Sequence, residues 1–264
     1  MRIAIGLEYD GSGFHGWQSQ PFGRTLQDAV ESAVSFIAGG KIEVSAAGRT
    51  DRGVHALSQV AHFDVDVQRP LQAWVRGVNS NLPDGIAVLW AKPVEESFHA
   101  RFSALFRRYR YVLLNHPVRP GLTSGKVGWC HQALDLDNMR EGADHLIGEH
   151  DFSAFRAAEC QANSPFREMM EITIERHGDY FVFDITANAF LHHMVRNIVG
   201  SLVHVGMGKH PPKWMGELLA SRNRTLAAPT FSPCGLYFAE VGYDARWELP
   251  LAQGRGMTDF PGGA

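Results

Sequence analysis

The order of hydrophobic patterns in the first hundred residues constrains the fold more than any other feature of the chain. Apolar residues alternate with polar ones in some segments, as in strands, and recur at helical spacing in others. The segments are a strand at 2–9, a helix at 26–37, a strand starting at 42, a strand at 61–67, a helix at 71–78 and a strand at 86–90. This β-α-β-β-α-β order predicts a ferredoxin-like unit.

The helix at 26–37 has the clearest boundaries. Thr25 is expected to be its N-cap, and Asp28 places a carboxylate where it can reach back toward the cap. Gly39 and Gly40 follow the last apolar position and are expected to end the helix.

A second α+β unit is expected after the strand at 105–114. Its segments are a helix through Met139 and Leu146, a hairpin at 170–176 and 180–186, a helix with an apolar stripe from Leu191 to Val203, a helix from Pro212, and a strand at 235–241. We therefore predict two ferredoxin-like-derived α/β subdomains, 1–104 with the Asp51 loop and 105–246. The Gly- and Pro-rich residues 247–264 are expected to be a flexible tail.

Composition favours an ordinary globular protein of the cytoplasm. With 264 residues and 45% hydrophobic content, the chain can bury a core without metal or disulfide staples. The three cysteines are far apart and lack zinc-site spacing, and no signal peptide or membrane-spanning run is expected. The net charge of −3 argues mildly against a nucleic-acid partner, so local charge clusters matter more than the total.

Asp51 is the strongest candidate for chemistry. It lies in the loop at 48–56 (GRTDRGVHA), with Arg49 and Arg52 as near neighbours and glycines at both ends of the turn. A cation within about 4–6 Å lowers the pKa of a carboxyl group, so Asp51 is expected to stay ionised, as a nucleophile or a base requires. The alternative is a surface ion pair that caps a turn.

Three glycines form a GxGxxG pattern directly after the first strand. Gly11, Gly13 and Gly16 resemble a dinucleotide fingerprint, but the helix that should begin inside the motif starts only near residue 25. We therefore interpret the glycines as shaping a loop that carries His15 and Trp17.

The strand at 105–114 combines basic and aromatic residues. Tyr109 and Tyr111 share one face, and Arg108 and Arg110 share the other. One tyrosine could stack on a base while the other packs in the core, with arginines meeting phosphates. The alternative is that both tyrosines belong to the core, which is the commoner outcome.

His192, His193 and Arg196 come near the start of the helix expected from 191. A metal site is not expected, because adjacent histidines would point to different helix faces and no carboxylate follows at i+4. An arginine on an apolar helix needs an anionic partner if it is buried, and Asp51 is our candidate.

Six ordered segments resemble the motifs of TruA-type tRNA pseudouridine synthases. They are YDGSGFHGWQSQP (9–21), GRTDRGVHALSQVAHF (48–63), FHARFSALFRRYRYVL (98–113), GEHDFSAFR (148–156), ANAFLHHMVRNIVGSLVHVG (187–206) and GLYFAEVGY (235–243). The resemblance covers nearly the whole chain apart from its C-terminal end.

The resemblance implies the α+β pseudouridine synthase fold, with the active-site cleft between the two subdomains. It also implies a homodimer that isomerises uridines 38, 39 and 40 of the tRNA anticodon stem-loop to pseudouridine, without metal or cofactor. Asp51 then matches the nucleophile, Tyr109 the residue stacked on uracil, Arg196 the arginine that pairs with the carboxylate, and Arg49 one that helps to expel the base. The residues expected to bind the substrate are Tyr109, Arg49, Arg52, Arg107, Arg108, Arg110, His192, His193 and Leu236.

Two positions depart from the family pattern, and two rival functions stay open. Arg52 stands where alanine is frequent, and Phe238 where leucine is usual. A non-catalytic RNA-binding module would explain the basic strand but not Asp51. A metal-dependent phosphotransfer enzyme would need a second carboxylate to complete a magnesium site, and the sequence offers none in position.

Overall fold

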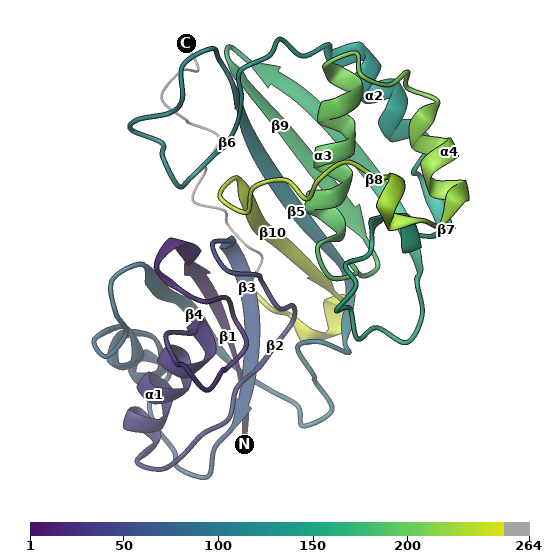
Figure 1. Cartoon of the computed structure of the whole chain (residues 1–264). Coiled ribbons are helices and arrows are strands. Elements are labelled where there is room, and N and C mark those ends of the chain that lie inside the picture. Colours follow the sequence, from purple (N-terminus) through teal and green to yellow (C-terminus); the bar gives the residue numbers. More distant parts are fainter. Residues whose placement is uncertain (251–264) are drawn as a thin grey trace. The chain divides into compact units, whose positions relative to one another are not determined.

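The computed structural model describes residues 1–250, which divide into two compact units (Figure 1). The first unit contains residues 1–105 and takes up the chain again from Tyr237, and the second contains Phe106–Leu236.

The first unit has the strand order of a ferredoxin-like fold. β4 (Ile86–Val94), β1 (Arg2–Tyr9), β3 (His55–Asp64) and the short β2 (Ser45–Ala46) lie side by side, each antiparallel to its neighbour. β10 (Leu236–Tyr243) shares the β2 edge of β3 and pairs in parallel with its first residues, Tyr237 with His55. Residues from the end of the chain therefore complete the sheet that carries the Asp51 turn.

The predicted helix boundaries of the first unit are confirmed at α1 (Leu26–Ala38). The Thr25 side chain accepts the backbone N–H of Asp28, and Gly39 ends the helix with φ of 77°. The second helical segment contains a π-helical stretch, Ala73–Gly77, whose Trp74 is fully buried against Phe63. Both helices thus contribute apolar side chains to the core of this unit.

The second unit places four strands in the order β5-β9-β8-β7. They are β5 (Ala104–Asn115), β9 (Tyr180–Ala187), β8 (Phe166–His177) and β7 (Gly148–Asp151), and β6 (Gly128–Cys130) pairs in parallel with the end of β5. The helices α2 (Leu136–Asp144), α3 (Met194–Gly206) and α4 (Trp214–Ser221) pack on one another, and α2 packs on β8 (Figure 1). Short 3-10 helices occur at Gly11–Gly13, Ser153–Phe155, Arg224–Leu226 and Ala245–Trp247.

Three predicted boundaries differ from the structure. The strand expected from residue 42 consists of Ser45–Ala46 alone, and β3 begins at His55, within the segment expected to be a loop. β3 extends back to His55 because Ala56, Gln59 and Val60 pair with β1, while His55 and Ala56 pair with β10. α3 begins at Met194, three residues after its expected start.

The predicted division into subdomains stays a prediction, because compactness does not test whether each part folds by itself. The units join residues 237–246 to the first part of the chain, whereas the prediction joined them to the second. Of the predicted tail, Trp247 is buried against Phe98, and residues 251–264 lie outside the described residues. Among residues 1–250, no helix is long and apolar enough to cross a membrane.

Candidate active site

Asp51 occupies a tight turn between β2 and β3 in the first unit. The backbone N–H of Val54 donates to the carbonyl of Asp51 (3.1 Å), and Gly53 has the positive φ of 78° that this turn requires. Thr50 and Val54 on either side are buried, whereas Asp51 is half-buried. The turn thus anchors its neighbours in the core and leaves the carboxylate partly accessible.

A buried hydrogen-bond cluster holds the turn on its N-terminal side. The hydroxyls of Tyr9 and Thr50 lie 2.8 Å apart, and both side chains are buried, at 4% and 5% exposure. The amide of Gln59 donates to the carbonyl of Gly48 (2.8 Å) and to the Tyr9 hydroxyl (3.4 Å). Burial raises the pKa of Tyr9 to about 12, so its hydroxyl stays protonated at neutral pH.

The loop with the GxGxxG pattern packs directly against the Asp51 turn. Gly16 has φ of 90°, and a Cβ there would lie 2.8 Å from the carbonyl oxygen of Thr50. A Cβ on Gly11 would lie 2.0 Å from the carbonyl oxygen of Val54. Trp17 donates its backbone N–H to Thr50 (2.9 Å). These glycines therefore allow two backbones to approach closely, in agreement with the prediction that they shape a loop.

His55 links this loop to the first turn of β3. Its Nδ1 lies 3.0 Å from a carboxylate oxygen of Asp10 and accepts the backbone N–H of Gly11 (3.2 Å). Its ring stacks on Tyr237 of β10, with 4.7 Å between ring centroids. His55 thus joins three chain segments that are distant in sequence.

The arginines beside Asp51 are exposed at the surface of the turn. Within the described part of the chain, neither Arg49 nor Arg52 makes a side-chain hydrogen bond or an ion pair. A charge can still act on a carboxyl group from about 4–6 Å without a hydrogen bond, so the expectation that these arginines keep Asp51 ionised stays a prediction.

The other departure from the family pattern, Phe238, is fully buried. A Cβ on Gly48 would lie 2.8 Å from the Phe238 ring, so glycine and phenylalanine fit one another at the start of the Asp51 loop. Leu236, expected to contact the substrate, is buried at the start of β10, where its N–H donates to the carbonyl of Pro233 (2.9 Å).

In the second unit, the predicted alternation along β5 is confirmed. Tyr111 is fully buried and donates its hydroxyl to the carbonyl of Ser232 (2.8 Å). Tyr109 is buried as well, at 8% exposure, which agrees with the alternative that both tyrosines belong to the core. Tyr109 lies on the same face, and its ring meets Phe190 edge-on at 5.0 Å. Phe190 was not anticipated as a neighbour of Tyr109, because it lies in the loop after β9.

The arginines of β5 are engaged by β9 and the loop after it. Arg110 faces Asp184 across the strand pair and binds both carboxylate oxygens, at 2.9 and 2.8 Å. Arg108 donates to the hydroxyl of Thr186 (3.1 Å), and Arg107 to the carbonyl of Asn188 (2.9 Å). The pairing with Asp184 uses Nε and Nη2 of Arg110 and leaves Nη1 outside that pair, so the expectation that Arg110 contacts the substrate stays a prediction.

Arg196 lies on α3, where every residue except Arg196 and His204 is buried. Its Nε donates to the carbonyl of Phe231 (2.8 Å), and the Phe231 N–H donates back to the Arg196 carbonyl (3.2 Å). This reciprocal pair ties the guanidinium to the segment that precedes β10.

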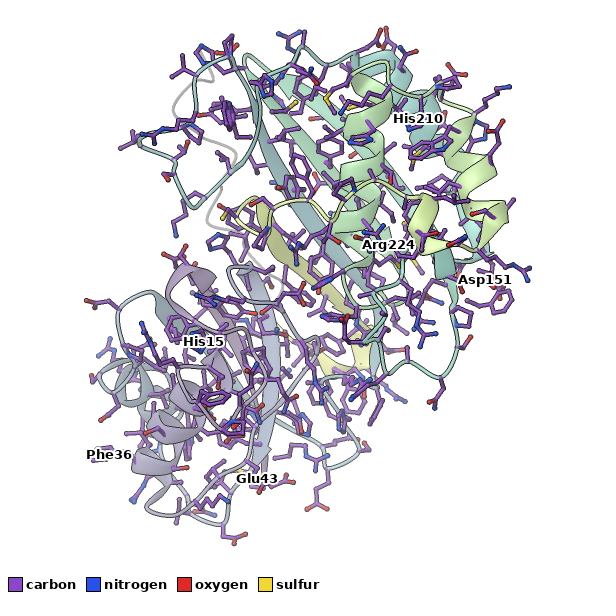
Figure 2. The ribbon with its side chains drawn as sticks, in the orientation of Figure 1. His15, Phe36, Glu43, Asp151, His210 and Arg224 are labelled. Atoms are coloured by element: carbon purple, nitrogen blue, oxygen red, sulfur yellow. The ribbon has the colours of Figure 1, made fainter. Side chains whose placement is uncertain are left out.

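A second polar cluster holds that segment in place. Asn197, fully buried, accepts hydrogen bonds from Arg224 (3.0 Å) and from the Thr230 hydroxyl (2.7 Å), and donates to the carbonyl of Phe155 (2.7 Å). Arg224, labelled in Figure 2, also donates to the Thr230 hydroxyl (3.0 Å). Burial lowers the pKa of Arg224, a cation held here by neutral oxygens.

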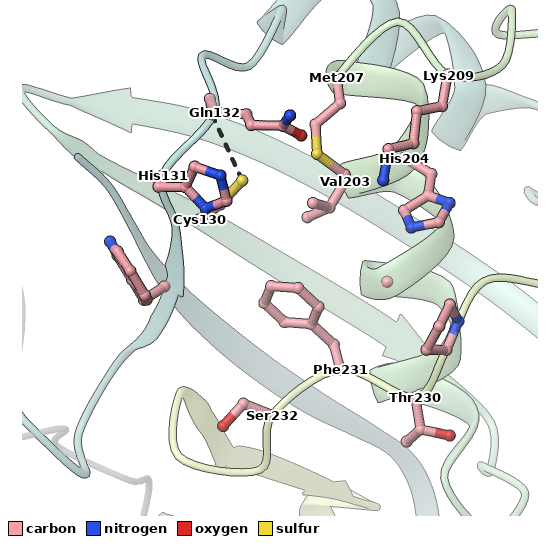
Figure 3. A pocket seen from close by; sticks show the side chains of 13 residues that line it. Cys130, His131, Gln132, Val203, His204, Met207, Lys209, Thr230, Phe231 and Ser232 are labelled. Carbon is pink, nitrogen blue, oxygen red and sulfur yellow. Dashed lines mark hydrogen bonds between the residues drawn. The ribbon is translucent and has the colours of Figure 1, made fainter. Parts of the chain in front are cut away.

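A pocket of about 310 Å³ adjoins the same segment (Figure 3). Phe231 and Ser232 line it together with residues of β6 and α3, and of the described residues around it none is acidic. Burial raises the pKa of the Cys130 thiol in its wall, which keeps the thiol protonated at neutral pH.

His192 and His193 lie in the turn before α3, and the expectation that they project from different faces of that helix is wrong. Their rings lie 4.0 Å apart, and His193 has φ of 61° as the residue that precedes the helix. The reversal at His193 brings the two rings to one side, which a helical spacing argument misses.

Comparison with known proteins identifies the family. A family model described as tRNA pseudouridine synthase matches residues 6–103 and 143–244. The chain is 62% identical over 255 residues to tRNA pseudouridine synthase A of Thiobacillus denitrificans, covering 97% of this chain and 98% of that protein. The chain belongs to the tRNA pseudouridine synthase family. It is also 60% identical over 250 residues to the synthase A of Dechloromonas aromatica (95% of each chain) and 55% identical over 253 residues to that of Burkholderia thailandensis (96% and 94%).

Membership confirms the resemblance seen in the sequence, the α+β pseudouridine synthase fold, and the enzyme class, an isomerase of tRNA modification. The residues matched by the tRNA pseudouridine synthase model include Asp51 and Arg196 but not Tyr109. Sequence reasoning missed Tyr9, Thr50 and Gln59, although a glutamine within the apolar strand SQVAHF was a signal of a buried polar role.

Proposed function

We propose that this enzyme isomerises uridines 38, 39 and 40 in the anticodon stem-loop of tRNA to pseudouridine, with Asp51 as the nucleophile. The supporting observation is a carboxylate on a turn whose neighbours are locked by buried hydrogen bonds, in a chain 62% identical to a named tRNA pseudouridine synthase A. Such preorganisation suits covalent chemistry, because a displaced nucleophile loses rate steeply.

The reaction breaks the C1′–N1 bond of uridine, rotates the uracil and joins C1′ to C5. The hydrogen on C5 leaves as a proton, and N1 gains one, so no redox step occurs. Asp51 is proposed to attack C1′ or to remove a sugar proton next to it, and either route needs the ionised carboxylate. Arg49 and Arg52 are exposed and are proposed to occupy the space of the flipped base or to meet phosphates.

Residues of the second unit complete the proposal. Tyr109 is proposed to stack on the target uracil, since a base flipped out of a stem costs a few kcal/mol that stacking offsets. Arg196, held by Phe231, is proposed to pair with the carboxylate of Asp51, and His192 and His193 to contact the nucleotide. Arg107 and Arg108 are proposed to contact the RNA backbone.

Tritium release from unmodified tRNA labelled at C5 of uridine tests the proposal. The wild type should release tritium, and Asp51→Asn, which keeps the shape and removes the charge, should not. Asp66→Asn serves as the matched control, because Asp66 is an exposed carboxylate of the same unit. Transcripts that keep one uridine each at positions 38, 39 and 40 would assign the targets.

The rival functions predict other outcomes. Binding of tRNA by the wild type without tritium release would leave a non-catalytic RNA-binding module. Loss of activity in EDTA would favour a metal-dependent reaction. A homodimer in the cytoplasm is part of the proposal, and sedimentation equilibrium of the purified protein tests the dimer.

A further inference from the structure

The turn between β4 and β5 presents a phenylalanine to solvent. Phe102 is 75% exposed and belongs to the segment FHARFSAL. Phe22 and Phe36 of the same unit are exposed to a similar degree, at 87% and 72%, so exposure alone does not mark a site. Phe102 is distinguished by the groups packed around its ring and by the fixed backbone that carries it.

The backbone of this turn is fixed by its own side chains. Nδ1 of His99 accepts the backbone N–H groups of Arg101 (3.1 Å) and Phe102 (3.4 Å). The Ser103 hydroxyl accepts the His99 N–H (3.0 Å), and the Ser103 N–H donates to the His99 carbonyl (2.8 Å). The segment thus forms a closed turn in which His99 acts as the cap.

The rest of the first unit anchors the same turn. The Ala100 N–H donates to Nδ1 of His62 (3.2 Å), and the Ala100 carbonyl accepts the Tyr243 hydroxyl (2.6 Å). Arg2 donates to the carbonyl of Phe98 (2.8 Å) while it pairs with Asp64. An aromatic ring mounted on so constrained a backbone can bind a partner without a large loss of conformational entropy.

One cationic side chain and one histidine lie against the exposed ring, and burial lowers the pKa of that histidine, His99. The guanidinium carbon of Arg101 lies 5.5 Å from the ring centroid, and the His99 ring lies 4.3 Å from it at a tilt of 37°. An exposed aromatic face beside a guanidinium matches a nucleotide, whose base stacks on the ring while its phosphate meets the cation. A protein partner fits less well, because a stable interface buries about 800 Å² on each side, far more than Phe102 and the neighbouring Leu105 supply.

We infer that Phe102 and Arg101 form a stacking site for an unpaired base of the tRNA, separate from the residues that act on the target uridine. The inference rests on the proposed function, since it takes tRNA as the ligand. It adds a contact that holds the RNA by stacking, which tolerates any base, and it assigns His99 as the residue that positions the ring.

Affinity for an unmodified tRNA transcript, measured by fluorescence anisotropy, tests the site. Phe102→Ala should weaken binding about 5- to 100-fold, the range expected for one lost base–aromatic contact. Phe102→Trp should restore affinity, whereas Phe102→Leu, apolar but without a π-face, should not. Phe36→Ala is the matched control, because Phe36 is 72% exposed on α1 of the same unit (Figure 2) and should change affinity less than twofold.

The outcomes separate this inference from the proposed function. Equal affinities of Phe102→Ala and Phe36→Ala would overturn the stacking site. A change in the sedimenting mass of Phe102→Ala without a change in its tRNA affinity would also overturn the stacking site. That result would show that Phe102 lies at a contact between protein chains. A wild type that binds tRNA without releasing tritium would overturn the proposed function instead, and the anisotropy series would still judge the stacking site. Thermal melts of each variant show whether it is folded. If Phe102→Ala is not folded, the affinity of Phe102→Leu is compared with that of Phe36→Ala in its place.

Discussion

Tyr9→Phe should damage both the stability and the activity of the enzyme. The substitution removes one buried hydroxyl and leaves the Thr50 hydroxyl, 2.8 Å away in the wild type, without that partner. Loss of a net hydrogen bond and burial of an unsatisfied hydroxyl together cost about 1.5 to 2.5 kcal/mol. In a chain of this size, that corresponds to a fall in Tm of roughly 4–8 °C.

The activity should fall through Asp51. Thr50 is adjacent to Asp51 and is positioned by Tyr9, so its release allows the turn to relax. Misplacement of a nucleophile by about 1 Å costs on the order of 100-fold in rate, so a partial shift should lower kcat/KM by roughly tenfold or more. Tritium release at several tRNA concentrations would measure kcat and KM separately, and kcat should carry most of the loss.

A double-mutant cycle with Thr50→Val decides whether the pair acts as a unit. If it does, the double variant is less destabilised than the sum of the single variants by about 1 kcal/mol. Tyr180→Phe, a half-buried tyrosine of the second unit, is the control and should stay within about 0.5 kcal/mol of the wild type. Additive effects of Tyr9→Phe and Thr50→Val, or unchanged activity of Tyr9→Phe, would refute the view that this cluster holds the Asp51 turn.

Three further predictions follow from single contacts. Burial lowers the pKa of His62 to about 4, so below pH 6.5 the unfolded chain binds a proton at His62 that the folded chain does not. Urea titrations should therefore show the free energy of unfolding falling by up to about 3 kcal/mol between pH 6.5 and 4. The fall should be smaller in His62→Gln. Gly16→Ala should lower stability and kcat together, measured by thermal melts and tritium release, because its Cβ would lie 2.8 Å from the carbonyl oxygen of Thr50. The slope of log affinity for tRNA against log salt concentration should be modest, about −3. Arg49→Gln should make this slope shallower by about 1. Arg110→Gln should barely change the slope, because Arg110 already binds the carboxylate of Asp184.

The elements of the fold were largely predictable where local chemistry sets them. Thr25 and Gly39 marked the ends of α1 because caps act through adjacent residues, and the alternation of Tyr111 with Arg110 placed one in the core and the other against Asp184. The start of β3 was not predicted, because residues 56–60 are ordered by pairing with β1 and His55 pairs with β10, about 180 residues later in the chain. No local pattern at His55 reports a strand that arrives from so far away.

In the candidate site, too, residues with a local motif could be predicted and residues that depend on strand pairing could not. Asp51 and Arg196 could be selected from their motifs, yet the contacts that position them come from residues with no motif of their own. Gln59 and Tyr9 lie on different strands, and their relation to Thr50 depends on the pairing of β1 with β3. The expectation that Arg49 and Arg52 keep Asp51 ionised stays a prediction, because side-chain direction in a turn depends on φ and ψ, which the letters GRTDRG do not specify.

Asp51 and Arg196, the two groups proposed to act on the substrate or to pair with one another, lie on segments that buried polar clusters hold in addition to apolar packing. Tyr9 and Gln59 secure the backbone before Asp51, and Asn197 and Arg224 secure the backbone that holds Arg196. Hydrogen bonds are directional, so a satisfied polar cluster permits fewer alternative arrangements than an apolar contact of similar energy. A reaction that detaches a base, turns it and rejoins it within one site needs this property, because the protein must keep one geometry while the substrate passes through several.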